Sequence, residues 1–170
     1  MTAKIISNVR ILDASGDAPF DGEIEIQGNR IKTVARGQGA LAREGQAVLD
    51  GMGCTLMPGL IEAHAHPSFA DIANFEEIGD TPPEEHTLLT AHFARVLLDA
   101  GFTSLFGAAS AKPRVEVAVR NFINDGMIKG PRMLVASPEL TVTGNLGDVA
   151  MRHMYRETFG IVCDGADEFR

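Results

Sequence analysis

Apolar and polar residues alternate over short stretches in the first part of the chain. Ile5–Ile11 is rich in residues that favour strands, and Glu23–Gln27 alternates with the period of a half-buried strand. Gly28-Asn29 then offers a two-residue turn into another apolar-polar stretch at 30–34. The pattern predicts that residues 4–57 form a small β segment with a structural role.

Beyond this segment, apolar runs are separated by amphipathic stretches. Gly101 and Gly126 end two stretches with helical periodicity, and residues 71–80 suit either a loop or a short helix. Strands are expected at 60–66, 103–106 and 133–136, and helices at 87–100 and 115–125. The order strand, helix, strand, helix, strand predicts βα units of a parallel sheet.

Two histidines, His64 and His66, end the first of these expected strands. In an extended chain they share one face, about 6.6 Å apart, whereas a helix would rotate them about 200° apart. Two imidazoles on one face can bind a single divalent cation at about 2.1 Å each. The pattern alone is weak, because histidine pairs in strands also form ordinary hydrogen bonds. Glu62, on the same face, either orients a ligand histidine or is a buried carboxylate paired with a basic residue.

Composition narrows the class of protein. With 170 residues, 45% of them hydrophobic, the chain can bury one sizeable core and is not disordered by composition. A net charge of −8 argues against a nucleic-acid-binding surface and a basic membrane patch. Cys54 and Cys163 form no C-x-x-C motif, so neither a zinc knuckle nor a redox pair is indicated. Two free thiols suit a reducing compartment, and a single disulfide is the alternative that the sequence leaves open. Without a signal-peptide core or an apolar run of membrane-spanning length, a cytoplasmic chain is expected.

The run Met57-Pro58-Gly59-Leu60-Ile61-Glu62-Ala63-His64-Ala65-His66 resembles the first-strand signature of the amidohydrolase superfamily of metal-dependent hydrolases. The family pattern is Pro-Gly-Leu-Ile-Asp followed by His-x-His after one residue, so Glu62 stands where aspartate is usual. Gly130-Pro131-Arg132 resembles the opening of the third strand in the imidazolonepropionase/prolidase-like branch. Further similar landmarks lie at 48–53 and 100–105.

The resemblance implies an α/β fold, the amino-terminal part of a TIM-like (β/α)8 barrel preceded by a small β-sandwich segment. Residues 1–57 would belong to the small domain, and residues 58–170 would supply about three of the eight barrel strands. A whole barrel needs about 250 residues, so we expect a fragment, a processed piece or a split subunit of a larger enzyme. The remainder of the barrel would come in cis or as a second chain.

The resemblance also implies a metal-dependent hydrolase that cleaves the C–N bond of an amide, peptide or cyclic amide with metal-activated water. His64 and His66 would bind one or two divalent ions, with zinc the first choice, and the catalytic residues are expected beyond residue 170. A deaminase or lactonase of the same superfamily, or a non-catalytic subunit of this fold, is the alternative. The expected partners are a small amide or peptide and further copies of the chain, with no nucleic acid and no membrane.

A glycine-rich stretch after the third expected strand offers further candidates. In barrels of this kind the active site lies at the carboxyl ends of the strands. Turn chemistry accounts equally well for the asparagine and aspartate there, and the Gly-Gly-His-Gly histidine found in relatives is absent. The substrate-pocket candidates are Thr143, Asn145, Asp148 and His153. Of the other histidines, His86 is expected to be exposed and His92 to be structural.

Overall fold

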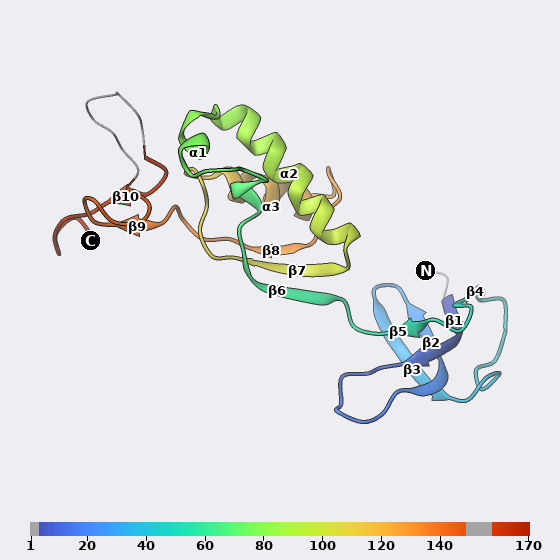
Figure 1. The fold of residues 1–170 in the computed structure, drawn as a ribbon. Coiled ribbons are helices and arrows are strands. Elements are labelled where there is room, and N and C mark those ends of the chain that lie inside the picture. Colours follow the sequence, from blue (N-terminus) through green and yellow to red (C-terminus); the bar gives the residue numbers. More distant parts are fainter. Residues whose placement is uncertain (1–3, 149–157) are drawn as a thin grey trace. The chain divides into compact units, whose positions relative to one another are not determined.

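Figure 1 shows the computed structural model of the chain, which describes residues 4–148 and 158–170, without the side chain of Glu76. The chain divides into two compact units, Met1–Pro58 and Gly59–Arg170. None of the helices in the described part is long and apolar enough to cross a bilayer.

The first unit is one five-stranded sheet. Strands β3, β2, β1 and β4 lie side by side in that order, and β5 pairs with the far end of β1. The β1–β2 and β2–β3 pairs are antiparallel, whereas β4 and β5 run parallel to β1. The strands are β1 Lys4–Ile11, β2 Phe20–Gln27, β3 Arg30–Arg36, β4 Ala47–Asp50 and β5 Thr55–Leu56. Val9, Ile11 and Ile24 form the buried core of this sheet. Strand β2 is not half-buried as its alternation predicts, because Glu23 and Glu25 are buried as well.

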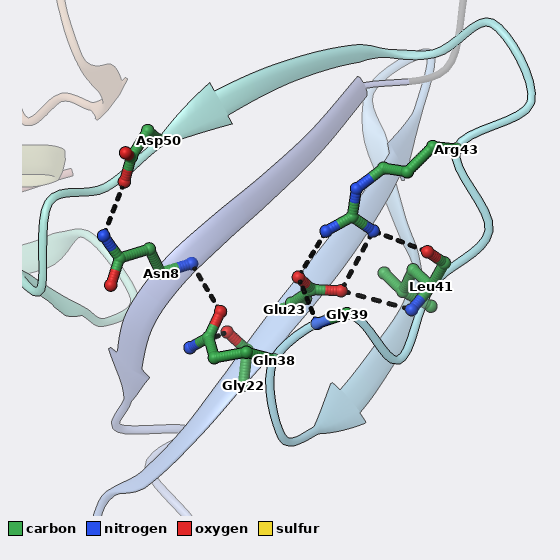
Figure 2. A network of polar contacts seen from close by, with 8 residues as sticks. All are labelled: Asn8, Gly22, Glu23, Gln38, Gly39, Leu41, Arg43 and Asp50. Carbon is green, nitrogen blue, oxygen red and sulfur yellow. Dashed lines mark hydrogen bonds and ion pairs between the residues drawn. The ribbon is translucent and has the colours of Figure 1, made fainter.

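The loop after β3 is bound to a buried carboxylate of β2, that of Glu23 (Figure 2). Glu23 is 1% exposed. It accepts hydrogen bonds from the Arg43 guanidinium at 2.5 and 3.1 Å and from the backbone N–H groups of Gly39 at 2.9 Å and Leu41 at 3.1 Å. The Arg43 guanidinium, with support from the two backbone donors, lowers the pKa of Glu23 to about 2. The loop is therefore held by a carboxylate whose ionised form is fully hydrogen-bonded.

The second unit is built on a parallel sheet of strands β6, β7 and β8, in that order. Its elements are β6 Leu60–Ala65, the 3-10 helix η1 Pro67–Phe69, α1 Glu76–Asp80, α2 Pro83–Asp99, β7 Phe102–Gly107, α3 Val115–Asn124 and β8 Arg132–Leu134. A separate parallel pair follows, β9 Leu140–Thr141 with β10 Ile161–Val162. The predicted βα order is confirmed, and the undecided stretch 71–80 contains the short helix α1.

Helices α2 and α3 pack on the sheet through a shared apolar core (Figure 1). Helix α2 begins four residues earlier than predicted, at Pro83, because proline is favoured in the first turn of a helix. Gly101 (φ 99°) and Gly126 (φ 72°) follow the two helices in the left-handed region, where glycine carries no steric penalty. The core consists of Ala65, Ala94, Leu105, Val119 and Met133.

Apolar side chains of this sheet also remain exposed. Ile61, Phe106 and Leu134 are 70%, 50% and 66% exposed, and they line a groove of about 560 Å³. The described residues thus form a mixed α/β fold, and the three parallel strands β6, β7 and β8 do not close into a barrel.

Candidate functional site

His64 and His66 lie where the first parallel strand ends. Strand β6 stops at Ala65, so His64 is the penultimate strand residue and His66 is the first residue after it. The pairing of β6 with β7 is irregular between Glu62 and Ala65. The two imidazole centroids are 4.9 Å apart, edge to face, and both rings line the same pocket. The rings thus come together at a strand end where the pairing with β7 is irregular.

The His66 ring is held on two sides. Its Nδ1 lies 3.4 Å from the carbonyl oxygen of Ala109, and its face stacks on Phe69 with 4.5 Å between centroids. When Nδ1 carries the proton, it donates to this carbonyl and leaves the Nε2 lone pair available for a cation. Imidazoles that bind metals commonly donate their other N–H group in this manner.

The carboxylate of Glu62 contacts the main chain beside these rings. Its Oε1 accepts a hydrogen bond from the backbone N–H of His64 at 3.1 Å. This bond braces the strand end that carries His64. That Glu62 also orients an imidazole stays a prediction.

The donor set suits a metal but is incomplete within the described residues. Among residues 4–148 and 158–170 there is no group of three or more histidine, cysteine, aspartate or glutamate side chains placed to bind a metal ion. Catalytic zinc usually has three protein ligands. His64 and His66, with the Ala109 carbonyl behind one of them, therefore suit two of these ligand positions, and the described residues place no third ligand beside them.

Aromatic side chains surround the pocket that His64 and His66 line. It has a volume of about 630 Å³. Phe75 and Phe159 stack at 5.5 Å, and Phe69 meets their rings edge-on at 6.3 and 5.7 Å. Pro138, Leu140 and Leu146 add further apolar surface, whereas Glu139 and Ser137 are polar. A largely apolar wall therefore adjoins the two imidazoles.

The predicted substrate-pocket residues take part in the turns around β9 and β10. Thr143 donates to Asp164 from its backbone N–H (2.7 Å) and its hydroxyl (2.6 Å). Asp148 accepts from the Gly144 N–H, and the Asn145 side chain accepts from the Leu146 N–H. Of the described residues that line the histidine pocket, none is Thr143, Asn145 or Asp148. Their substrate role stays a prediction, and His153 lies outside the described residues.

The expectation that His86 is exposed is wrong. The side chain is 2% exposed, and Nε2 contacts the carbonyl oxygen of Ser68 in η1. Because α2 starts at Pro83, His86 lies in its first turns, and this helix packs against η1. Burial lowers the pKa of His86, which favours the neutral ring.

Sequence reasoning missed a buried pair behind the histidines, Ser68 and Glu116. The Ser68 hydroxyl donates to Glu116 Oε1 at 2.7 Å and accepts the Ala111 backbone N–H at 2.9 Å. Both side chains are fully buried, and this burial raises the pKa of Glu116. A glutamate in the first turn of a helix usually faces water and complements the helix dipole, so only the position of Ser68 two residues after His66 could have drawn attention to it.

Several solved structures of known proteins resemble this chain. No family model and no curated protein matches the chain. A solved amidohydrolase matches with a TM-score of 0.82 at 27% identity, over 98% of this chain and 42% of that one. A prolidase bound to N-methylphosphonate-L-proline matches with a TM-score of 0.82 at 23% identity, over 98% and 41%. The A. niger ochratoxinase matches with a TM-score of 0.75 at 22% identity, over 98% and 42%.

These matches agree with the motif at the end of β6 and with the order of the landmarks after it. The chain spans about two fifths of the length of the structures that it resembles. The expected resemblance is confirmed: the chain is a structural match to the amidohydrolase and prolidase family over about 40% of those chains, as a partial segment of their fold.

Proposed function

We infer that this chain carries part of the active site of a metal-dependent hydrolase that cleaves a C–N bond in an amide, peptide or cyclic amide. The observation that carries the proposal is the pair of imidazoles at the carboxyl end of β6, 4.9 Å apart and lining one pocket. Active sites of parallel α/β barrels lie at this end of the strands.

His64 and His66 would bind the divalent ion, with zinc the first choice among borderline cations that prefer imidazole. When bound, such an ion supplies an activated water and polarises the scissile carbonyl. The Ala109 carbonyl keeps the His66 ring in place. The catalytic acid-base group and the remaining ligands are proposed to lie beyond residue 170.

The aromatic wall favours a substrate with an apolar group beside its scissile bond. Phe69, Phe75 and Phe159 offer ring faces and edges within the same pocket as the imidazoles. Apolar pockets with a few polar groups are typical of small-molecule sites. N-acyl amino acids and dipeptides with a bulky apolar side chain are therefore the first substrates to test.

The rest of the barrel, in cis or as a second chain, is the proposed partner of this chain. The exposed apolar face of the parallel sheet is the observation that favours it. Ile61, Phe106 and Leu134 are exposed on its strands, and parallel sheets are almost always covered on both faces.

The incomplete ligand set of the described residues is the observation that favours a second candidate, a non-catalytic subunit of this fold.

Metal analysis of the complete protein tests these functions. We expect zinc in the purified protein, hydrolysis of N-acyl amino acids, and loss of both in His64→Ala and His66→Ala. His92→Ala is the matched control, because His92 is an exposed histidine on α2. Full metal content and turnover in the two site variants would contradict the ligand assignment. A metal-free, inactive wild type that still assembles would favour the non-catalytic subunit.

A further inference from the structure

Ser68 joins three segments of the second unit at a single hydroxyl. It lies in η1, two residues after His66, and is fully buried. Its Oγ donates to Glu116 Oε1 on α3 and accepts the N–H of Ala111, in the loop after β7. The hydroxyl therefore ties the end of β6 to the loop after β7 and to the first turn of α3.

Glu116 is a buried carboxyl group that lies against the end of β7. Its side chain is 0% exposed, and Oε2 has no hydrogen-bond partner among the described atoms. A Cβ added to Gly107 would stand 2.3 Å from Oε2, so the glycine leaves the space that the carboxyl group occupies. An ionised carboxylate is costly in such a place, and burial raises the pKa of Glu116 accordingly. The neutral carboxyl group of Glu116 still accepts the hydrogen bond from the Ser68 hydroxyl, and no buried charge remains.

The loop held by this pair is the one that contacts His66. Ala109, whose carbonyl lies 3.4 Å from His66 Nδ1, is two residues before Ala111. At its other end the loop is tied to β6 by the bond from Ala108 N to the Ala65 carbonyl, at 2.9 Å. The position of the Ala109 carbonyl therefore depends on both anchors.

We propose that Ser68 and Glu116 are positioning residues, which hold the Ala109 carbonyl against His66 and thereby select the ring nitrogen of His66 that faces the pocket. The Nδ1–H form is kept, and Nε2 is presented to the pocket. The consequence for metal affinity rests on the proposed function, whereas the consequence for the histidine tautomer does not.

The same residue types occur in nucleophilic triads, but the geometry here excludes that role. The Ser68 hydroxyl is fully buried and already donates to Glu116. The ring of His86 contacts the Ser68 carbonyl oxygen, not the hydroxyl. A triad requires the base within hydrogen-bond reach of the nucleophilic oxygen, so the cluster serves to position and not to attack.

The test uses the complete protein with ¹⁵N-labelled histidine. Long-range ¹H–¹⁵N spectra of the metal-free protein report the tautomer of His66, assigned with His66→Gln, and zinc affinity is measured by competition with a chelator. In Ser68→Ala we expect a mixed tautomer and zinc affinity lowered about 10- to 100-fold, as for other partners of metal-binding histidines. Glu116→Gln keeps a neutral acceptor for the hydroxyl and should resemble the wild type in both measurements.

Val119→Ala is the matched control, because Val119 is a buried residue of the same helix and belongs to the apolar core. It should lower stability while leaving the tautomer and zinc affinity unchanged. If Ser68→Ala does not fold, Glu116→Leu removes the acceptor at similar volume and should shift the tautomer in the same direction.

Two outcomes would overturn the positioning role. One is a wild-type tautomer in Ser68→Ala and Glu116→Leu; the other is an equal change in Val119→Ala, which would indicate general loosening. A wild type that binds no zinc contradicts the proposed function instead, and the tautomer measurement then decides the positioning role alone.

Discussion

Two buried glutamates, Glu23 and Glu116, are held in opposite electrostatic surroundings. Glu23 accepts hydrogen bonds from the Arg43 guanidinium and two backbone N–H groups, so its ionised form is stabilised. Glu116 accepts one bond from the neutral Ser68 hydroxyl, so burial favours its protonated form. The pKa therefore falls in one case and rises in the other for the same side chain.

The first prediction concerns the acid stability of the first unit. Folding lowers the pKa of Glu23 from 4.5 to about 2, so its stabilisation is complete above pH 4.5 and is lost as the pH falls towards about 2. Glu23→Gln should remove this part of the pH dependence. Hydrogen exchange of the Gly39 and Leu41 amides between pH 2 and 7 measures it, after correction for the intrinsic exchange rate. Glu25→Gln, a change at another buried glutamate of β2, should keep the dependence; its loss there would contradict the assignment to Glu23.

The second prediction concerns the stability of the second unit, which should change with pH in the opposite direction. Because the folded state raises the pKa of Glu116 above 4.5, the unfolded chain loses its proton first, and stability falls as the pH rises above 4.5 towards the folded value. Glu116→Gln should flatten this fall and stabilise the second unit at neutral pH. Exchange of α3 amides, followed by mass spectrometry from pH 4 to 8, measures it. An equal slope in Glu116→Gln would show that another group is responsible.

At the scale of elements, close contacts between β7, α3 and η1 decide how the strand ends meet. Gly107 at the end of β7 leaves room for the Glu116 carboxyl group, whose Oε2 would lie 2.3 Å from an added Cβ. The first turns of α2 bury His86 against η1, so the segment after His66 is packed from two helices. The hydrogen bond from the Ala111 N–H to the Ser68 hydroxyl ties the loop that carries Ala109 to this packed segment.

The third prediction follows from that packing. Gly107→Ala should destabilise the second unit by about 1–3 kcal/mol, because the new methyl group would stand 2.3 Å from Glu116 Oε2 and force the carboxyl group to move. Urea unfolding of the complete protein measures the change. Gly165→Ala is the control, since an added Cβ there meets no atom within 4 Å, and its effect should stay within about 0.5 kcal/mol. Equal effects at the two positions would contradict the close packing.

At the scale of the whole molecule, the apolar strand residues of the open sheet need a covering surface. Ile61, Phe106 and Leu134 are exposed in the described structure. Exposed apolar patches of this kind mark interaction surfaces or aggregation sites. The proposed remainder of the barrel would cover them and complete the ligand set of His64 and His66.

The fourth prediction is that residues 1–170, expressed alone, self-associate and show no amidase activity. Leu134→Asp should reduce this association, because it places a charge on the exposed face, whereas Leu88→Asp on α2 should not, although Leu88 is 73% exposed. Sedimentation with and without a co-expressed downstream segment measures it. A monomeric, metal-loaded and active 170-residue product would overturn the proposed need for the rest of the barrel.

Local patterns in the sequence were sufficient to predict several of the strands, the helix ends and the family. Alternation and turn residues located β1, β2 and β3 but not the short strands β4 and β5, and Gly101 and Gly126 located the helix ends, because these signals depend on neighbouring residues alone. The run from Met57 to His66, together with the landmarks at 48–53, 100–105 and 130–132, indicated the family, which the structural matches confirm.

Contacts between distant residues were decided only by the tertiary structure. Ser68 meets Glu116 across 48 positions, and Ala109 meets His66 across 43. Phe159 stacks on Phe75, although no periodic pattern links them. His86 was mispredicted because the pattern places the helix start at residue 87 and does not show which face η1 will cover. Periodicity reports the local conformation of the chain, whereas burial and hydrogen-bond partners depend on how segments far apart in sequence are packed.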